Sequence, residues 1–223
     1  SYTRRIGISG MHGKSTTTSM CAALLMDAGC DPTVLSGAEY NKMGGAYRVG
    51  GHDFFVFEAC EYKDSFLDFN PTVAVILNIE PDHLDYFSGI EQIKQSFCEY
   101  ARRPGCECVV ANADDENVRE VTVAAGRPTV TFSLHSRSAD FVAANIATEG
   151  GMYTFDVLKR GEFFCRVRLG VAGMHNISNA LAAIAVADIC GIAPDVIVRS
   201  LAGFRGANRR MEFKGMLNGA RVY

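Results

Sequence analysis

Apolar residues along the chain follow two alternating patterns. Residues 72–77 (Thr-Val-Ala-Val-Ile-Leu) are apolar on both faces, which is typical of a strand inside a parallel sheet that helices cover. Residues 16–28 instead repeat apolar side chains at helical spacing, and Ser88 and Glu91 match a capping box at a helix start. The pattern predicts strands over 3–9, 33–35, 53–57, 72–77, 107–111 and 129–132, and helices over 16–28, 88–100, 116–125, 175–189 and 194–201. This alternation predicts an α/β fold with a doubly wound, mostly parallel sheet.

A different pattern occupies residues 140–170. Three strand-like segments, 141–148, 152–158 and 162–169, are separated only by short turns that contain glycine. Short turns of this kind join antiparallel strands. We expect a small antiparallel three-stranded sheet packed alongside the main sheet, and not a second domain.

Composition and charge narrow the classes of protein. With 223 residues and 48% hydrophobic residues the chain can bury a sizeable core, which argues against disorder. A net charge of −3 disfavours a nucleic-acid partner, which normally requires a basic surface. The chain lacks the run of about 20 apolar residues that spans a bilayer, and no apolar segment of a signal peptide follows the N-terminal arginines. We therefore expect no membrane partner and a cytoplasmic location.

The eight cysteines do not have the spacing of a disulfide framework. Cys21 and Cys190 lie in apolar helical patterns, and Cys60 follows an apolar strand, so we expect small buried thiols in a reducing compartment. Cys106 and Cys108 lack a second spaced pair, which argues against a zinc site.

The segment Gly10-Met-His-Gly-Lys-Ser-Thr16 lies between a predicted strand and a predicted helix. A glycine-rich turn lets backbone N–H groups converge on an anion, and the helix that follows adds the positive end of its dipole. Lys14 would place a charge near the outer phosphates of a nucleotide, and Ser15 a hydroxyl near Mg²⁺. Ile8 stands where the usual P-loop has its first glycine. The alternative is a turn of small residues that binds nothing.

Polar side chains end two further predicted strands. Glu58 follows an apolar strand, Asn78 follows residues 72–77, and His83 lies in the loop after Asn78. Ligands of open α/β sheets bind at the carboxyl ends of strands, so these groups could meet the phosphates and a Mg²⁺ ion. Alternatively, Glu58 points to solvent or pairs with a lysine, and Asp85 in the same loop is structural.

Two more segments could have either a structural role or a role in nucleotide binding. His175, Asn176 and Asn179 either cap the helix that they open or hydrogen-bond an adenine. Arg209 and Arg210 are either solvated or neutralise phosphate charge.

Taken in order, these motifs resemble those of the Mur ligases, ATP-dependent enzymes that form amide bonds in peptidoglycan synthesis. The resemblance rests on Gly10-Met-His-Gly-Lys-Ser-Thr-Thr-Thr18, Glu58-Ala-Cys-Glu61, Asn78-Ile-Glu-Pro-Asp-His-Leu-Asp85, His175-Asn176-x-x-Asn179-Ala180 and Arg209-Arg-Met-Glu212. It covers essentially the whole chain. Within the family, Gly-x-His-Gly-Lys, Glu-Ala-x-Glu and Ser65-Phe-Leu67 are most similar to the branch that joins L-alanine to UDP-N-acetylmuramate.

The resemblance implies a role for each matching residue. It implies catalytic roles for Lys14, Glu58, His83 and Arg210, metal binding by Ser15, Glu58 and His83, and substrate contact by Glu61. It implies ATP binding by Gly10, Met11, His12, Gly13, Lys14, Ser15, Thr16, His175, Asn176, Asn179 and Arg210. ATP and Mg²⁺ are the implied cofactors, and UDP-N-acetylmuramate and L-alanine the implied substrates. The sugar-linked carboxylate would attack the γ-phosphate, and alanine would then attack the acyl phosphate.

The resemblance also implies a domain organisation. Residues 1–215 would form the central ATP-binding domain and 216–223 the start of a link to a C-terminal domain. Because the sequence lacks an initiator Met and ends in a strand-like run at 219–223, we expect a piece of a longer bacterial protein. Its N-terminal UDP-binding domain and its C-terminal domain would lie outside this chain.

The sequence departs from the family pattern in two respects, and two alternative functions remain open. Met11 replaces the usual threonine, and no lysine stands where several relatives carry a carbamylated one, since Lys94 is displaced. A recycling ligase that adds a whole peptide to the same sugar nucleotide shares the glycine-rich loop. A nucleotide-binding module without chemistry is the alternative from another class.

Overall fold

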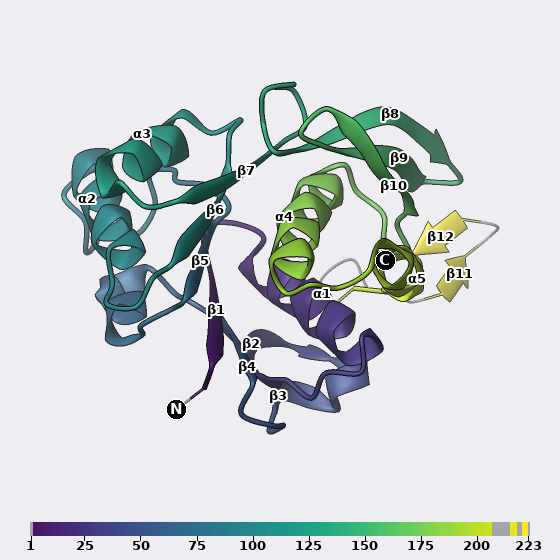
Figure 1. Cartoon of the computed structure of the whole chain (residues 1–223), viewed down its shortest axis with the longest axis horizontal. Coiled ribbons are helices and arrows are strands. Elements are labelled where there is room, and N and C mark those ends of the chain that lie inside the picture. The colour runs from purple at the N-terminus through teal and green to yellow at the C-terminus, as the bar shows by residue number, and fades with distance from the viewer. Residues whose placement is uncertain (1, 207–214, 218–219, 223) are drawn as a thin grey trace.

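Ten strands form one sheet within the part of the chain that the computed structural model describes, residues 2–206, 215–217 and 220–222 (Figure 1). Their order across the sheet is β10-β9-β8-β7-β6-β5-β1-β4-β2-β3. The strands are β1 (Arg4–Ser9), β2 (Thr33–Tyr40), β3 (Gly45–Arg48), β4 (Phe54–Glu58), β5 (Val73–Ile76), β6 (Cys108–Asn112), β7 (Thr129–Ser133), β8 (Phe141–Glu149), β9 (Met152–Lys159) and β10 (Glu162–Arg168). A separate hairpin pairs β11 (Gly215–Leu217) with β12 (Ala220–Val222).

Parallel pairing runs through the middle of the sheet, from β2 to β8. Within this sheet the antiparallel pairs are β2–β3, β8–β9 and β9–β10. The predicted doubly wound, mostly parallel sheet with an antiparallel three-stranded part is therefore confirmed.

The expected separation of that antiparallel part was wrong. Backbone pairing of Phe132 with Phe141 and of Ser133 with Val142 joins β8 to β7, so the three strands continue the main sheet. In Figure 1 they curl over helix α4 (His175–Ile189). The physical reason is that β8 pairs with β7, the last strand of the parallel part of the sheet. The parallel strands and the antiparallel strands therefore share one hydrogen-bonded sheet with no free edge between them.

Helices cover both faces of the sheet (Figure 1). One face carries α1 (Lys14–Asp27), α4 and α5 (Pro194–Gly203), and the other carries α2 (Ile90–Ala101), α3 (Glu116–Ala125) and the 3-10 segment η2 (Tyr62–Asp68). A short 3-10 turn, η1 (Asn41–Met43), connects β2 to β3. Two hydrophobic clusters, one on each side of the sheet, hold these layers together. Across the described part of the chain, no helix is both long and apolar enough to cross a membrane.

Helix boundaries depart from the predictions by at most two residues. Helices α3 and α4 have the predicted bounds, whereas α1 begins two residues earlier, at Lys14. The capping box at Ser88 was wrong, because α2 begins at Ile90 and the Ser88 N–H donates to Gln92 Oε1 instead. Asp115 does cap α3, since its Oδ1 accepts a bond from the Val118 N–H at 3.0 Å.

The thiols are not uniformly buried. All eight cysteines are free, and Cys21 and Cys165 are buried, but Cys60 is exposed, which corrects its grouping with buried thiols. Cys60 follows the end of β4, where the chain turns out of the sheet toward η2. Burial raises the pKa of the Cys190 thiol to about 11.

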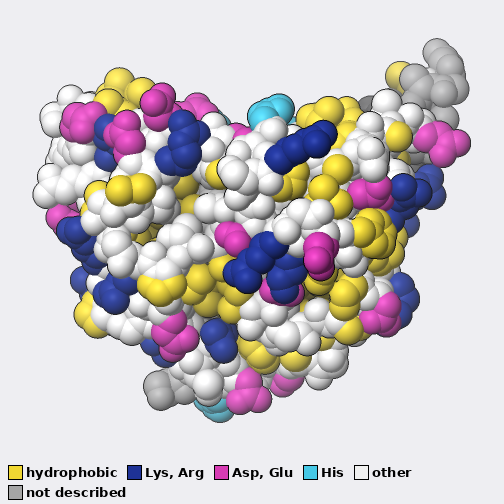
Figure 2. Space-filling model, turned by 45° about the horizontal axis from the view of Figure 1, so that its top comes forward, with side chains coloured by type: hydrophobic (Ala, Val, Ile, Leu, Met, Phe, Trp, Pro, Cys, Tyr) yellow, Lys and Arg dark blue, Asp and Glu magenta, His cyan; other side chains and the backbone are white. Residues whose placement is uncertain are grey.

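Charged side chains are spread over the surface. Figure 2 shows Lys and Arg side chains interspersed with Asp and Glu side chains on the face that it draws. This mixture agrees with the small net charge of −3.

Gly7 of β1 is required by packing. A Cβ at this position would collide with the Tyr100 hydroxyl and lie 2.7 Å from Phe57 Cζ. Tyr100 is fully buried, and burial raises the pKa of its hydroxyl well above the usual value. The first glycine before the loop therefore makes room for an aromatic ring on the face covered by α2.

Gly7→Ala should destabilise the fold by about 1–3 kcal/mol, because an overpacked core cannot absorb a methyl group without shifting its neighbours. Urea unfolding followed by circular dichroism measures this loss. Gly203→Ala is the matched control, since a Cβ there meets nothing within 4 Å. Equal unfolding midpoints for the wild type and Gly7→Ala would contradict the packing argument.

Candidate functional site

The loop between β1 and α1 depends on two glycines. Gly10 and Gly13 have φ values of +137° and +86°, which favour glycine. A Cβ on Gly10 would lie 3.0 Å from Leu77 Cβ, and a Cβ on Gly13 would lie 2.5 Å from Asn179 Oδ1. The loop therefore packs tightly between the end of β5 and helix α4.

Asn78 holds the loop from the side of β5. Its Oδ1 accepts a bond from the His12 N–H at 2.8 Å, and its Nδ2 donates to the His12 carbonyl at 3.0 Å. The Met11 N–H donates to the Asn78 carbonyl at 3.3 Å. The polar strand end noticed in the sequence thus fixes the backbone of the glycine-rich loop. The His12 side chain is exposed, with Nε2 3.8 Å from Glu80 Oε2.

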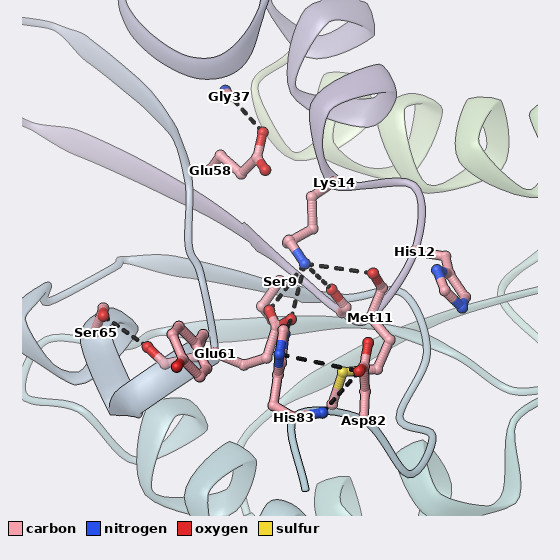
Figure 3. A network of polar contacts seen from close by, with 12 residues as sticks. Ser9, Met11, His12, Lys14, Gly37, Glu58, Glu61, Ser65, Asp82 and His83 are labelled. Atoms are coloured by element: carbon pink, nitrogen blue, oxygen red, sulfur yellow. Dashed lines mark hydrogen bonds and ion pairs between the residues drawn. The ribbon is translucent and has the colours of Figure 1, made fainter. Parts of the chain in front are cut away.

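Lys14 begins α1 and turns back into this loop. Its Nζ donates to the Gly10 carbonyl at 2.6 Å and to Glu61 Oε1 at 2.9 Å (Figure 3). The Lys14 side chain is 13% exposed and that of Glu61 only 1%. A buried carboxylate is tolerated only with such a partner, because desolvation of an unpaired charge costs several kcal/mol or more. Ser15 and Thr16 follow in the first turn of α1, where Ser15 is buried.

His83 completes a three-residue cluster with Lys14 and Glu61 (Figure 3). Its Nε2 lies 3.4 Å from Glu61 Oε1, and its backbone N–H donates to Asp82 Oδ1. The three side chains come from the start of α1, from the segment after β4 and from the loop after β5. These elements meet because β4, β1 and β5 are adjacent parallel strands whose carboxyl ends share one edge.

Glu58 lies apart from this cluster. It ends β4, and its Oε2 accepts a bond from the Gly37 N–H of β2 at 2.9 Å, as Figure 3 shows. The structure thus brings Glu61 into contact with Lys14 and His83, and places Glu58 beside β2. Sequence reasoning had considered Glu61 as a substrate contact and as a candidate for holding a second Mg²⁺, but not as the partner of Lys14. The signal that could have found it is the spacing of two carboxylates three residues apart at a strand end.

The start of α4 touches the loop from the other side. Asn176 Nδ2 donates to the Ala172 carbonyl at 2.6 Å, and Asn179 Nδ2 donates to Asn176 Oδ1 at 3.0 Å. Both asparagines are buried, and Asn179 Oδ1 faces Gly13. The predicted capping of α4 by these residues was wrong, because the helix has Met174 at its N-cap and no side-chain cap hydrogen bond. His175 is exposed. Arg209 and Arg210 lie outside the described residues.

The site offers few side chains that could bind Mg²⁺. Over residues 2–206 and the two short strands, no group of three or more His, Cys, Asp and Glu side chains could hold a metal ion. Glu61 Oε2 is a buried oxygen that makes an ion pair with Lys14 Nζ at 2.9 Å and has no further hydrogen bond from the described residues. Mg²⁺ keeps several waters and phosphate oxygens and takes few protein ligands. A buried carboxylate that already pairs with a cation and lies beside His83 therefore fits a phosphate-bound Mg²⁺.

Comparisons with known sequences agree in one family. The profile described as the Mur ligase middle domain matches residues 8–187. The chain is 45% identical to UDP-N-acetylmuramate–L-alanine ligase of Caldicellulosiruptor saccharolyticus and 44% identical to that of Acetivibrio thermocellus, over 100% and 99% of its length. It covers 49% and 48% of those two proteins, so it spans about half the length of the curated relatives that it matches.

Solved structures of Mur ligases also superpose on this chain. The UDP-N-acetylmuramate–alanine ligase of Thermotoga maritima superposes with a TM-score of 0.85 at 27% identity, over 97% of this chain and 48% of that one. The Neisseria UDP-N-acetylmuramate:L-alanyl-γ-D-glutamyl-meso-diaminopimelate ligase gives 0.81 at 30% identity, over 92% and 67%. The predicted resemblance is confirmed: this chain belongs to the Mur ligase family and corresponds to its middle domain.

Proposed function

We propose that this chain is the ATP-binding part of a bacterial, cytoplasmic ligase that uses ATP and Mg²⁺ to join L-alanine to UDP-N-acetylmuramate. The observation that carries the proposal is the convergence of Lys14, Glu61 and His83 beside the glycine-rich loop. The named relatives that the chain matches over nearly its whole length support the choice of substrates. Residues 1–215 would form the ATP-binding domain, and 216–223 would begin the link to a further domain.

Each residue of the cluster would act on the phosphates. The loop N–H groups and the α1 dipole favour a polyanion next to Gly10–Gly13. Lys14 would leave its carbonyl partners and its ion pair to contact the outer phosphates, and this would expose the Glu61 carboxylate. Bound Mg²⁺ would neutralise phosphate charge as the γ-phosphoryl group moves. Glu61 and His83 would hold that ion together with Ser15. Glu58 is a further candidate metal ligand, which the family pattern suggests.

The reaction would then follow in two steps. The carboxylate of the muramate substrate attacks the γ-phosphorus, the bond to ADP breaks, and an acyl phosphate forms. The amine of alanine next attacks the acyl carbon and phosphate leaves with the bonding electron pair. Lys14 stabilises the negative charge that develops on the phosphate oxygens. Arg210 would reach the terminal phosphate and His175 the adenine, by family pattern.

Replacing Lys14 tests the phosphate site. Lys14→Ala should weaken ATP binding by about 10- to 100-fold, because a charge-assisted contact is lost. Isothermal titration calorimetry of the 223-residue chain measures the affinity. Lys42→Ala is the control, since Lys42 pairs with Asp27 on the surface. Identical heats for the wild type and Lys14→Ala would contradict the proposed phosphate site.

The effect of Mg²⁺ on nucleotide affinity shows whether Glu61 or Glu58 is the metal ligand. We define the magnesium gain as the ratio of ATP-analogue affinity in Mg²⁺ to that in EDTA. Glu61→Gln should lower the gain by about tenfold, since a neutral amide is a poor Mg²⁺ ligand. Glu58→Gln should leave it within about twofold, because the amide oxygen still accepts the bond from Gly37. The reverse outcome would assign the ion to Glu58.

A second candidate substrate follows from the Neisseria structure, whose name specifies a peptide in place of alanine. ADP release by the longer protein that contains this chain, with UDP-N-acetylmuramate and either L-alanine or the tripeptide, decides between them. We expect release with L-alanine, and none from the chain alone. ADP release only with tripeptide would identify the recycling reaction. No release with either would favour a binding module without chemistry.

A further inference from the structure

Two segments beside the Lys14–Glu61–His83 cluster exchange hydrogen bonds in both directions. The Tyr62 hydroxyl of η2 donates to Asp85 Oδ2 in the loop after β5, at 2.9 Å. The Tyr86 hydroxyl of that loop donates to Asp64 Oδ2 of η2, at 2.6 Å. Each segment therefore supplies one tyrosine and one aspartate. We call these four residues the crossed clamp.

One ring of the crossed clamp packs against the imidazole of His83. The ring of Tyr62 lies against the ring of His83, with centroids 4.7 Å apart and planes tilted by 40°. The rings of Tyr62 and Tyr86 also meet edge to face, at 6.3 Å. The bond from Tyr62 to Asp85 thus fixes the ring that covers one face of the histidine.

Backbone strain gathers in these same two segments. Lys63, Asp64 and His83 have φ values of 53°, 56° and 52°, in the left-handed region that non-glycine residues rarely occupy. Such residues persist only where surrounding contacts hold them, and they cluster at functional sites. Here the flanking Phe66 and Phe87 are buried in the core, which anchors both segments.

The carboxylate of Asp64 is tied to a helix as well. Ser96 of α2 donates to Asp64 Oδ1, so the clamp connects the loop after β5 to α2 through η2. The clamp therefore consists of two tyrosine hydroxyl donors and two aspartate carboxylate acceptors.

We propose that the crossed clamp is a positioning device for the phosphate-bound metal: Tyr62, Asp64, Asp85 and Tyr86 hold His83 beside Glu61. The inference rests on the proposed function, since it names what aligns the ligands of that same site. Without the clamp, the strained backbone at His83 relaxes and its imidazole leaves Glu61. The four residues act through His83 and are therefore positioning residues.

The double variant Tyr62→Phe with Tyr86→Phe tests the proposal, because both rings stay and only the hydroxyls are lost. We expect the magnesium gain to fall by about tenfold, with affinity in EDTA unchanged within about twofold. Tyr47→Phe is the matched control, since Tyr47 is an exposed tyrosine on β3 at the edge of the sheet. Asp85→Asn should preserve the gain, because its amide oxygen still accepts from Tyr62, whereas Asp85→Ala should lower it.

Hydrogen exchange supplies a readout that needs no nucleotide. The amides of Tyr86 and Phe87 donate to the His83 carbonyl, at 2.9 and 3.0 Å. The double variant should speed their exchange by about tenfold relative to the wild type. Unchanged exchange would overturn the clamp, and so would faster exchange with an unchanged magnesium gain. A wild-type chain that binds no ATP in the presence of Mg²⁺ would instead contradict the proposed function, and the exchange rates still decide whether the hydroxyls hold the loop.

Discussion

Lys14 and Glu61 form an ion pair whose carboxylate is almost completely buried. Neither charge is tolerable alone in that position, since removing one partner leaves an uncompensated charge out of water. The pair therefore couples the glycine-rich loop to the segment after β4. The lysine also donates to loop carbonyls, so the conformation of the loop depends on the same contact.

The order of strands explains why this contact exists. β1 lies between β4 and β5, and all three run parallel, so three loops leave the sheet at one edge. One loop brings the glycines and Lys14, the second brings Glu61, and the third brings Asn78 and His83. The chemistry-bearing residues are far apart in sequence, yet the topology leaves them as neighbours.

Local patterns predicted the elements well, because helix spacing and β-branched runs depend on neighbours in sequence. Helices α3 and α4 and the glycine-rich turn were predicted in this way. Three-dimensional features were not. The pairing of Glu61 with Lys14, the joining of β8 to β7 and the exposure of Cys60 all depend on the direction in which a chain leaves a strand. The capping box failed for a related reason, since Gln92 competed for the Ser88 N–H. The need for glycine at position 7 likewise depends on a distant residue, Tyr100, which lies 93 positions away in sequence.

The loop itself is held from two opposite sides. Asn78 bonds both backbone groups of His12 from the end of β5, and Asn179 abuts Gly13 from α4. Asn179 is in turn fixed by Asn176, which is anchored on a backbone carbonyl. The backbone of this receptor thus loses its conformational entropy when the protein folds, so an incoming anion meets a preorganised cradle and spends little of its interaction energy on ordering it.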